Sequence, residues 1–298
     1  MRPLLHCGCI CQHSYGGLRT VESVRQLSSQ LAEIREQLGQ YRAGSVDLTK
    51  NNDTGVAIIT LNNPQRKNAL SGSMMVELAD HVTDLSQWQA GKGLLLRGAE
   101  GTFCSGGDLT TVSAILTSSD GDRMSRFMHD TLSRFHALPL MSVALLEGVA
   151  LGGGAELATA CDLRVMTDSA RVGFVQVKMG VTTGWGGATR LYRLLGRHKT
   201  LALLCSGKLM TADQALALGF AQDVIPDQPL TGDAVEALLL DRYVRGPVPL
   251  VRAVKEMVVG IENSASLKDA LDLERNVFAS VWGGEAQKAA LQNNIKHS

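Results

Sequence analysis

The segment that decides the fold reads EGVALGGGAEL and occupies residues 147–157. It follows the continuous apolar run Met141–Leu146, which is typical of a strand buried on both faces. The three glycines at 152–154 leave their backbone amides open to a ligand because no Cβ covers them. A short helix is predicted over Ala155–Ala160, so these amides also lie at the positive end of a helix dipole. The segment therefore predicts a loop that binds an oxyanion or a phosphate.

A second glycine loop, FCSGGDL at residues 103–109, follows a short predicted strand over Leu94–Leu96. The phosphate alternative fails on spacing, because Gly154 is followed by Ala155-Glu156 and not by Lys-Ser/Thr. No G-x-G-x-x-G stretch stands between a strand and a helix, and no G-x-S-x-G nucleophile turn is present in the sequence. The oxyanion interpretation remains, with an ordinary tight turn as its structural alternative.

Outward from these loops, strands alternate with helices. Apolar residues at helical spacing predict a helix over residues 24–38, and Ser71 is a suitable N-cap for a helix that reaches Leu85. Further elements are predicted as strands within 44–60 and at 163–166, and as helices at 123–135, 188–195, 199–205 and 211–218. The last 65 residues are predicted to be mainly helical. The pattern indicates an α/β fold with a C-terminal helical appendage.

The composition sets limits on the partners. The chain has 298 residues, of which 45% are hydrophobic, and 29 Lys and Arg balance 29 Asp and Glu. This hydrophobic content excludes general disorder, and zero net charge gives no electrostatic reason to expect nucleic acid. Apolar runs such as Met141–Leu146 are far shorter than the ~18 residues of a membrane span. We therefore expect a globular protein with neither a nucleic-acid nor a membrane partner.

The six cysteines do not form a disulfide framework. Cys104, Cys161 and Cys205 lie in or beside apolar runs, as free core cysteines do. The three at positions 7, 9 and 11 lie between two histidines, but C-x-C-x-C lacks the two-plus-two spacing of zinc ligands, so no metal site is expected. Residues 1–21 contain two arginines and no acid, which predicts a disordered or targeting tail. The expected compartment is the cytosol, with the mitochondrion as the alternative.

Five ordered motifs carry a family resemblance. They read NNPQRKNAL (62–70), FCSGGDL (103–109), EGVALGGGAEL (147–157), ACDLR (160–164) and GWGGATRL (184–191). Together they resemble the crotonase (enoyl-CoA hydratase/isomerase) superfamily, in register from about Gly44 to Ile225. The resemblance implies a spiral of ββα units followed by helices that build a homotrimer or hexamer. The corresponding segments are a tail (1–21), an N-terminal helix (22–43), the crotonase core (44–232) and a C-terminal helical oligomerisation region (233–298).

The resemblance also implies the site. The amides of Gly107 and Gly153 would form an oxyanion hole for the thioester carbonyl of an acyl-CoA. Glu156 takes the place of one acid–base glutamate of the hydratases, and Gln176 takes the place of the other. The residues expected to contact the acyl group or CoA are Arg66, Lys67, Ala69, Ser105, Gly106, Gly152, Trp185 and Trp282. CoA is part of the substrate, so no separate cofactor is expected.

Gln176 decides between the reactions of this family. An amide cannot shuttle a proton, so hydration, which needs two acid–base groups, is disfavoured. Loss of carbon dioxide from a 2-carboxyacyl-CoA creates the same enolate without a base, and Glu156 remains to protonate it. The predicted activity is therefore decarboxylation. The resemblance implies short branched malonyl-type thioesters, ethylmalonyl-CoA and also methylmalonyl-CoA, as its substrates. The alternatives are an enoyl-CoA isomerase or hydratase and, as a different class, a non-enzymatic RNA-binding or scaffold protein. Glu156 argues for an enzyme.

Overall fold

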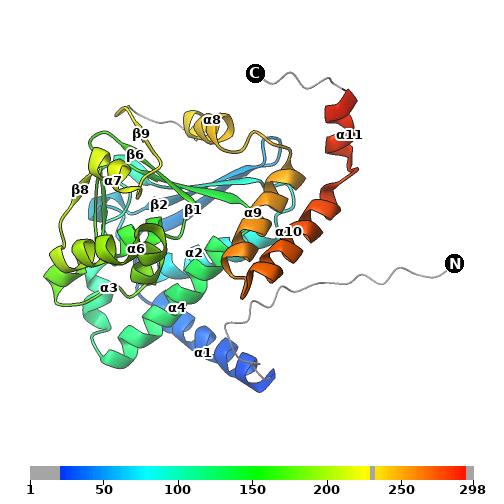
Figure 1. The fold of residues 1–298 in the computed structure, drawn as a ribbon. Coiled ribbons are helices and arrows are strands. Elements are labelled where there is room, and N and C mark those ends of the chain that lie inside the picture. The colour runs from blue at the N-terminus through cyan, green and yellow to red at the C-terminus, as the bar shows by residue number, and fades with distance from the viewer. Residues whose placement is uncertain (1–20, 229–231, 293–298) are drawn as a thin grey trace.

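The computed structural model describes residues 21–228 and 232–292 (Figure 1). The predicted tail, apart from Val21, and the cysteine cluster at positions 7–11 lie outside the described residues. The strands are β1 (Ser45–Asn51), β2 (Val56–Asn62), β3 (Gly93–Gly98), β4 (Met141–Leu146), β5 (Val149–Leu151), β6 (Leu163–Thr167), β7 (Arg171–Gly173), β8 (Met210–Thr211) and β9 (Asp223–Ile225). The helices of the core are α1 (Val21–Gly39), α2 (Gly72–Gln87), α3 (Leu109–Ala114), α4 (Ser118–His136), α5 (Gly153–Ala158), α6 (Gly187–Ser206) and α7 (Ala212–Leu218). The C-terminal region consists of α8 (Gly232–Arg242), α9 (Val248–Glu262), α10 (Leu267–Val281) and α11 (Glu285–Gln292).

Six strands form the main sheet in the order β1-β2-β3-β4-β6-β9. Only β1 runs antiparallel to its neighbour, and the other strands pair in parallel. A second sheet of three short strands, β5-β7-β8, lies beyond the carboxyl ends of this sheet's central strands. The arrangement is the α/β architecture that the sequence predicts.

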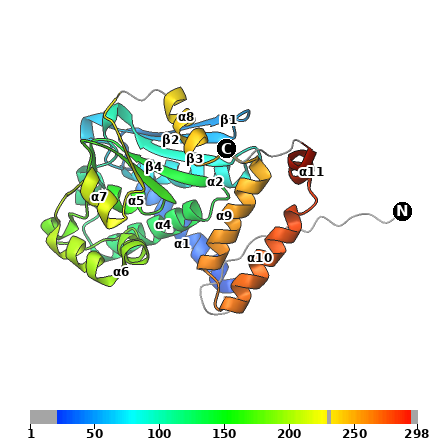
Figure 2. The ribbon, with the colours of Figure 1, turned by 45° about the horizontal axis from the view of Figure 1, so that its top comes forward.

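The central strands are apolar at every position because both faces of the sheet are covered. In β3, Leu94 and Leu96 face a core built with α1, α2 and α4, whereas Leu95 between them faces α8. Figures 1 and 2 show these helices on opposite faces of the sheet. With both faces packed, ligands can reach this sheet only at its strand ends, and the loops at the carboxyl ends carry the predicted motifs.

The break between the two helices predicted at 188–195 and 199–205 is present in the structure. The two helices expected at 188–195 and 199–205 form one element, α6, which breaks at Gly196, where φ is +76°. Glycine adopts this left-handed conformation without a steric penalty, so the chain can turn there and resume the helix. The strands of two or three residues, β5, β7, β8 and β9, are too short to give a recognisable sequence pattern.

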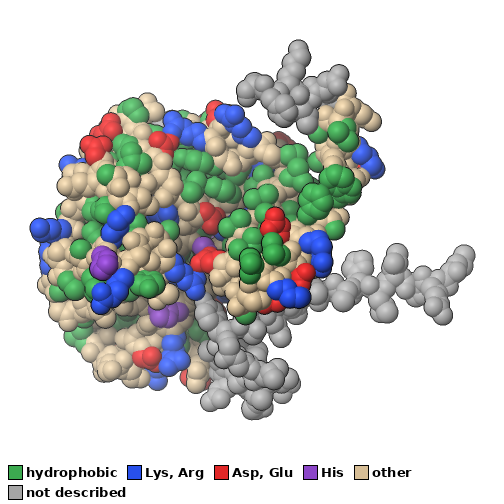
Figure 3. All heavy atoms as spheres, in the orientation of Figure 1, with side chains coloured by type: hydrophobic (Ala, Val, Ile, Leu, Met, Phe, Trp, Pro, Cys, Tyr) green, Lys and Arg blue, Asp and Glu red, His purple; other side chains and the backbone are tan. Residues whose placement is uncertain are grey.

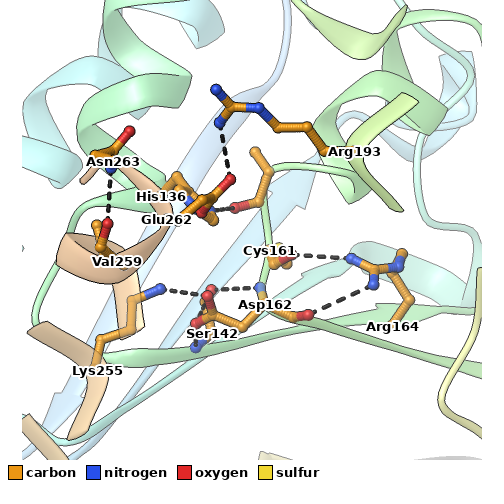
Figure 4. A network of polar contacts seen from close by, with 11 residues as sticks. His136, Ser142, Cys161, Asp162, Arg164, Arg193, Lys255, Val259, Glu262 and Asn263 are labelled. Carbon is orange, nitrogen blue, oxygen red and sulfur yellow. Dashed lines mark hydrogen bonds and ion pairs between the residues drawn. The ribbon is translucent and has the colours of Figure 1, made fainter. Parts of the chain in front are cut away.

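Two polar clusters attach α9 to the core (Figure 4). Lys255, buried on α9, pairs with Asp162, which in turn accepts a hydrogen bond from the Ser142 hydroxyl at 2.9 Å. At the end of α9, Glu262 pairs with His136 of α4 at 3.0 Å and with Arg193 of α6 at 2.8 Å. These contacts fix the helix from which the rest of the C-terminal region extends.

Beyond α9, helices α10 and α11 project away from the sheet as an arm (Figures 1 and 2). Within the described residues, α10 packs mainly against α9. Large apolar side chains remain exposed along the arm, and they gather on its surface in Figure 3: Leu267, Leu271, Phe278, Trp282 and Leu291. None of the helices described in residues 21–228 and 232–292 is both long and apolar enough to cross a membrane.

Glu262 should make this attachment dependent on pH. The hydrogen bond with His136, opposed by burial, lowers the pKa of Glu262 from 4.5 to about 2. A lowered carboxyl pKa stabilises the fold above the ordinary value, and that contribution is lost as pH falls through the folded value. We therefore expect Glu262→Gln to lower the thermal midpoint by roughly 1–3 °C at neutral pH, the scale of a partly exposed ion pair. The difference in thermal midpoint between Glu262→Gln and the parent should become smaller as the pH is lowered from 4.5 towards 2.

Thermal unfolding followed by circular dichroism at several pH values measures this gap. Lys268→Gln, which removes the exposed Lys268–Asp272 pair within α10, is the matched control and should produce little change. If the difference in thermal midpoint between Glu262→Gln and the parent stays constant to the lowest pH, the lowered pKa of Glu262 is contradicted.

Candidate active site

The two glycine loops are joined by backbone pairing. Because β3 and β4 are parallel neighbours, the segments that follow them leave the sheet side by side. The Cys104 amide donates to the Val149 carbonyl at 3.0 Å, and the Leu151 amide donates to the Cys104 carbonyl at 2.9 Å. These bonds fix the position of the first loop against the start of the second.

Glycines allow the loops to approach this closely. A Cβ on Gly154 would lie 2.2 Å from the Cys104 carbonyl oxygen, so no larger residue fits without separating the loops. Gly106 has a φ of +110°, and a Cβ there would lie 3.3 Å from the Gly153 nitrogen. Glycine at position 106 therefore keeps the approach to the Gly153 amide open.

The amides of Gly107 and Gly153 are both unpaired at this junction. On either side of Gly107, the Gly106 carbonyl and the Asp108 amide are both bonded to Leu70. Gly153 begins α5, where the first amides of a helix have no partner within the helix. Neither amide has a hydrogen-bond partner among the described residues. Two free donors at one junction are what an oxyanion hole requires.

A third loop, after β2, supports the first glycine loop. The side chain of Asn68 is fully buried, donates to the Ala99 carbonyl at 2.9 Å and accepts from the Asn63 amide at 2.9 Å. Asn68 therefore links the turn after β2 to the segment after β3. Asn68 stands inside the NNPQRKNAL motif, but the motif alone does not indicate this role. Its φ of +55°, a conformation that asparagine tolerates better than most residues, is not readable from that motif.

Most of the residues predicted to contact CoA lie along this third loop and the first glycine loop. Arg66 and Lys67 are exposed, and Arg66 also pairs with Asp108 at 2.7 Å. Burial by itself would raise the pKa of the Asp108 carboxyl. The hydrogen bond and the charge of Arg66 outweigh this effect, so the pKa is lowered. Ser105 donates its amide to the Lys67 carbonyl at 2.9 Å. Ala69 and Gly106 are buried in these two loops, and Gly152 is buried at the start of α5 in the second glycine loop.

Glu156 lies on α5, one turn after the free amide of Gly153, and its side chain is only 2% exposed. Its Oε2 accepts the backbone amides of Trp185 at 2.7 Å and Gly187 at 2.8 Å. Its Oε1 accepts the Gly184 amide at 3.2 Å and the Gln176 Nε2 at 2.9 Å. The predicted acid is therefore also the anchor of the 184–187 loop.

Gln176 lies at the start of a short 3₁₀ turn, Gln176–Met179, and its side chain faces Glu156. Its Nε2 must point to the carboxylate, which can only accept, so its Oε1 points away. This oxygen is buried and has no hydrogen-bond partner. A buried acceptor without a donor costs about 1–3 kcal/mol, and such atoms often mark functional sites.

Trp185 packs over the two glycines whose amides are unpaired. A Cβ on Gly153 would lie 2.5 Å from its Cζ3, and one on Gly107 would lie 3.8 Å from its Cζ2. Its carbonyl accepts a hydrogen bond from Arg190, and the neighbouring Gly184 carbonyl accepts one from Ser125 of α4 at 2.6 Å. The indole is thus held against both glycines by its backbone contacts.

Trp282 lies apart from the other predicted residues. It follows α10 on the C-terminal arm, is 64% exposed, and its ring packs against Phe278 with centroids 5.0 Å apart. No contact between Trp282 and either glycine loop is found in the described part of the chain. The described residues also contain no group of three or more His, Cys, Asp or Glu side chains placed to hold a metal.

These features define a class of protein: a crotonase fold with two convergent glycine loops and one buried glutamate. A family model for enoyl-CoA hydratase/isomerase matches residues 51–294, and the chain belongs to this family. It is similar to the crystal structure of an enoyl-CoA hydratase from Bacillus anthracis, with a TM-score of 0.75 and 27% identity over 84% of this chain and 95% of that one.

Among individual proteins, the chain is similar to ethylmalonyl-CoA decarboxylases. It is 45% identical to the protein of that name from Xenopus laevis, over 89% of this chain and 88% of the relative. It is 42% identical to the protein from Homo sapiens, over 89% of this chain and 86% of that relative. It also resembles a putative enoyl-CoA hydratase from Thermobifida fusca, whose structure contains acetoacetyl-CoA, with a TM-score of 0.70, 26% identity, and coverage of 84% and 96%.

The role of the Gly153 amide can be tested by two substitutions that differ in one atom group. Gly153→Ala and Gly153→Pro both place a Cβ against Trp185, but only proline removes the amide hydrogen. Proline is tolerated at the first position of a helix, so α5 should survive. We expect turnover of Gly153→Pro to fall about 10²–10³-fold below that of Gly153→Ala, the cost of one lost oxyanion donor.

Steady-state assays of acyl-CoA turnover measure this difference, with circular dichroism as the check on folding. Gly121→Ala is the control, because a Cβ at that α4 position meets nothing within 4 Å. Equal turnover of the alanine and proline variants would exclude the Gly153 amide as a donor.

Proposed function

We propose that this site decarboxylates 2-carboxyacyl-CoA thioesters, with ethylmalonyl-CoA as the main substrate and methylmalonyl-CoA as a second one. The observation that carries the proposal is the pairing of two free amides with a single carboxylate, Glu156, beside a neutral Gln176. The similarity to ethylmalonyl-CoA decarboxylases over 89% of the chain supports the choice of substrate.

The reaction begins with the thioester carbonyl oxygen bound by the amides of Gly107 and Gly153. The bond between Cα and the free carboxylate breaks, its electron pair moves into the thioester, and carbon dioxide leaves. The resulting enolate carries its negative charge on the oxygen that the two amides hold. Fixed donors aimed at developing charge are the strongest electrostatic device available to an enzyme, and no base is needed to form this enolate.

The enolate then needs a proton at Cα, and Glu156 is the group that we propose as its source. The four donors around Glu156 suit the carboxylate that remains after the proton has left. When the carboxyl carries a proton, a half-turn of the Gln176 amide would bring its unpaired Oε1 against that proton as an acceptor. Gln176 would thus partner both forms of Glu156, which explains why one of its amide atoms has no partner in this structure.

A neutral residue at position 176 also suits a dicarboxylic substrate. The substrate brings its own carboxylate into a pocket that already contains Glu156. A second glutamate would place another like charge there, and like charges in a partly dry site either repel or force one group to take a proton. This reasoning favours decarboxylation over hydration, whose two-carboxylate arrangement is incomplete in this chain.

Two variants separate these roles. Glu156→Gln should reduce decarboxylation about 10²–10⁴-fold, the contribution of a general acid, while substrate binding changes little. Gln176→Glu should instead raise the KM for ethylmalonyl-CoA and introduce slow hydration of crotonyl-CoA that the parent lacks. Mass spectrometry of the products from ethylmalonyl-, methylmalonyl-, crotonyl- and 3-enoyl-CoA measures both effects.

Parental turnover in Glu156→Gln would show that the glutamate is not the acid. Unchanged affinity of Gln176→Glu for ethylmalonyl-CoA would refute charge exclusion. A parent that isomerises 3-enoyl-CoA and releases no carbon dioxide would make the protein an isomerase.

The assembly that we propose is a homotrimer or hexamer. Support comes from the C-terminal arm, where α10 packs mainly against α9 and large apolar side chains remain exposed. Light scattering at micromolar concentration should give three or six times the chain mass of 31.8 kDa. Phe278→Asp should lower that mass, whereas Leu216→Asp, at an exposed position on α7, should not. A monodisperse monomer of the parent would contradict the proposal.

The compartment that we propose is the cytosol, on the low positive charge of residues 1–21. Fractionation of cells that express the full chain tests it, and recovery from mitochondria alone, in a shortened form, would overturn it.

A further inference from the structure

Trp185 carries a polar atom that the fold does not use. Its side chain is only 4% exposed, yet its indole N–H has no hydrogen-bond partner among the described residues. Two side-chain atoms of the described residues are both unpaired and shielded from solvent, namely Thr131 Oγ1 and Gln176 Oε1. Trp185 Nε1 is not one of them, so this unpaired nitrogen is in contact with solvent. The N–H therefore reaches open space from an otherwise buried ring. By contrast, the buried Trp88 donates its N–H to Asn52 at 2.8 Å.

The contacts of the ring place this donor beside the oxyanion hole. The six-membered ring of Trp185 lies against Gly153 through Cζ3 and against Gly107 through Cζ2. Nε1 is bonded to the ring carbon next to Cζ2, so the N–H is on the Gly107 side of the indole. Backbone bonds to Glu156 and Arg190 hold the residue at both ends of its peptide unit. The donor is consequently fixed in position before a ligand arrives.

We infer that the indole N–H of Trp185 binds the free carboxylate of the malonyl-type substrate and selects 2-carboxyacyl-CoA over simple acyl-CoA. This inference rests on the proposed function and adds the residue that recognises the group to be lost. With the thioester oxygen on Gly107 and Gly153, the free carboxylate is the only other charged acceptor on the acyl group.

The other polar groups around the pocket are already engaged. In this structure the Gln176 Nε2 donates to Glu156, and the Arg190 guanidinium is bonded to the Trp185 carbonyl and, at 3.0 Å, to the Thr159 hydroxyl. The indole N–H is a side-chain donor that remains uncommitted beside the two glycines.

A neutral donor suits a carboxylate that must leave as carbon dioxide. An ion pair with lysine or arginine would stabilise the charge and oppose its movement into the thioester. A single N–H can orient the carboxylate while leaving it ionised, and the flat indole excludes water from its other side. Once carbon dioxide has left, the product offers the N–H no charged acceptor.

Trp185→Phe removes the N–H and keeps an aromatic wall. We expect the KM for ethylmalonyl-CoA to rise about tenfold or more, the scale of one hydrogen bond to a charged group. The inhibition constant of butyryl-CoA, which lacks the carboxylate, should change by less than about twofold. Trp185→His, assayed at pH 8 as the neutral imidazole, returns an N–H to the ring and should recover part of the affinity for ethylmalonyl-CoA.

The inference would be overturned if Trp185→Phe lost affinity equally for ethylmalonyl-CoA and butyryl-CoA, or lost none for ethylmalonyl-CoA. If the variants do not fold, the unaltered chain is mixed rapidly with each ligand and its tryptophan fluorescence is followed before the first turnover. A change specific to ethylmalonyl-CoA is expected, and identical traces would overturn the inference. If the parent releases no carbon dioxide, the proposed function fails. Calorimetric titration of parent and Trp185→Phe with the unreacted thioester then tests the recognition separately.

Discussion

The site depends on the backbone pairing between Cys104 and the segment Val149–Leu151. This pairing extends the parallel register of β3 and β4 past the end of the sheet, and so it joins two loops that are about 45 residues apart in sequence. Glycines at 106 and 154 allow the approach, and the free amides of Gly107 and Gly153 result from it. A fold that covers both faces of its sheet keeps this junction at the strand ends, where a thioester can enter.

Glu156 connects the shape of the pocket to its chemistry. The carboxylate that we assign as the acid is also the acceptor for three backbone amides of the 184–187 loop, and that loop positions Trp185 over both glycines. Replacing Glu156 therefore has two consequences: one on proton transfer, the other on the wall of the pocket. For this reason Glu156→Gln, which keeps the shape and some hydrogen-bonding capacity, is more informative than a truncation to alanine.

Much of this could be predicted from the sequence, and the limits have physical causes. The glycine loops and the Glu156–Gln176 pair were predicted because they stand in contiguous motifs at fixed spacing, and the structure places Gln176 against Glu156. Trp185 and Trp282 looked equivalent as candidates, but only Trp185 lies at the glycine loops, a distinction set by tertiary packing. Asn68 was passed over because its role depends on carbonyls some 30 residues away. The strands of two or three residues depend on long-range contacts that local patterns do not encode, whereas the break in α6 at Gly196 agrees with the boundary predicted between two helices.

The central claim is that the two amides stabilise an enolate formed by loss of carbon dioxide, and isotope labelling tests it most directly. Ethylmalonyl-CoA with ¹³C in its free carboxylate is incubated with the purified protein in D₂O, and the gas and the thioester are analysed by mass spectrometry. The account predicts ¹³CO₂ together with butyryl-CoA that carries one deuterium at C2. Recovery of the labelled thioester intact, while crotonyl-CoA is hydrated or 3-enoyl-CoA is isomerised, would contradict it.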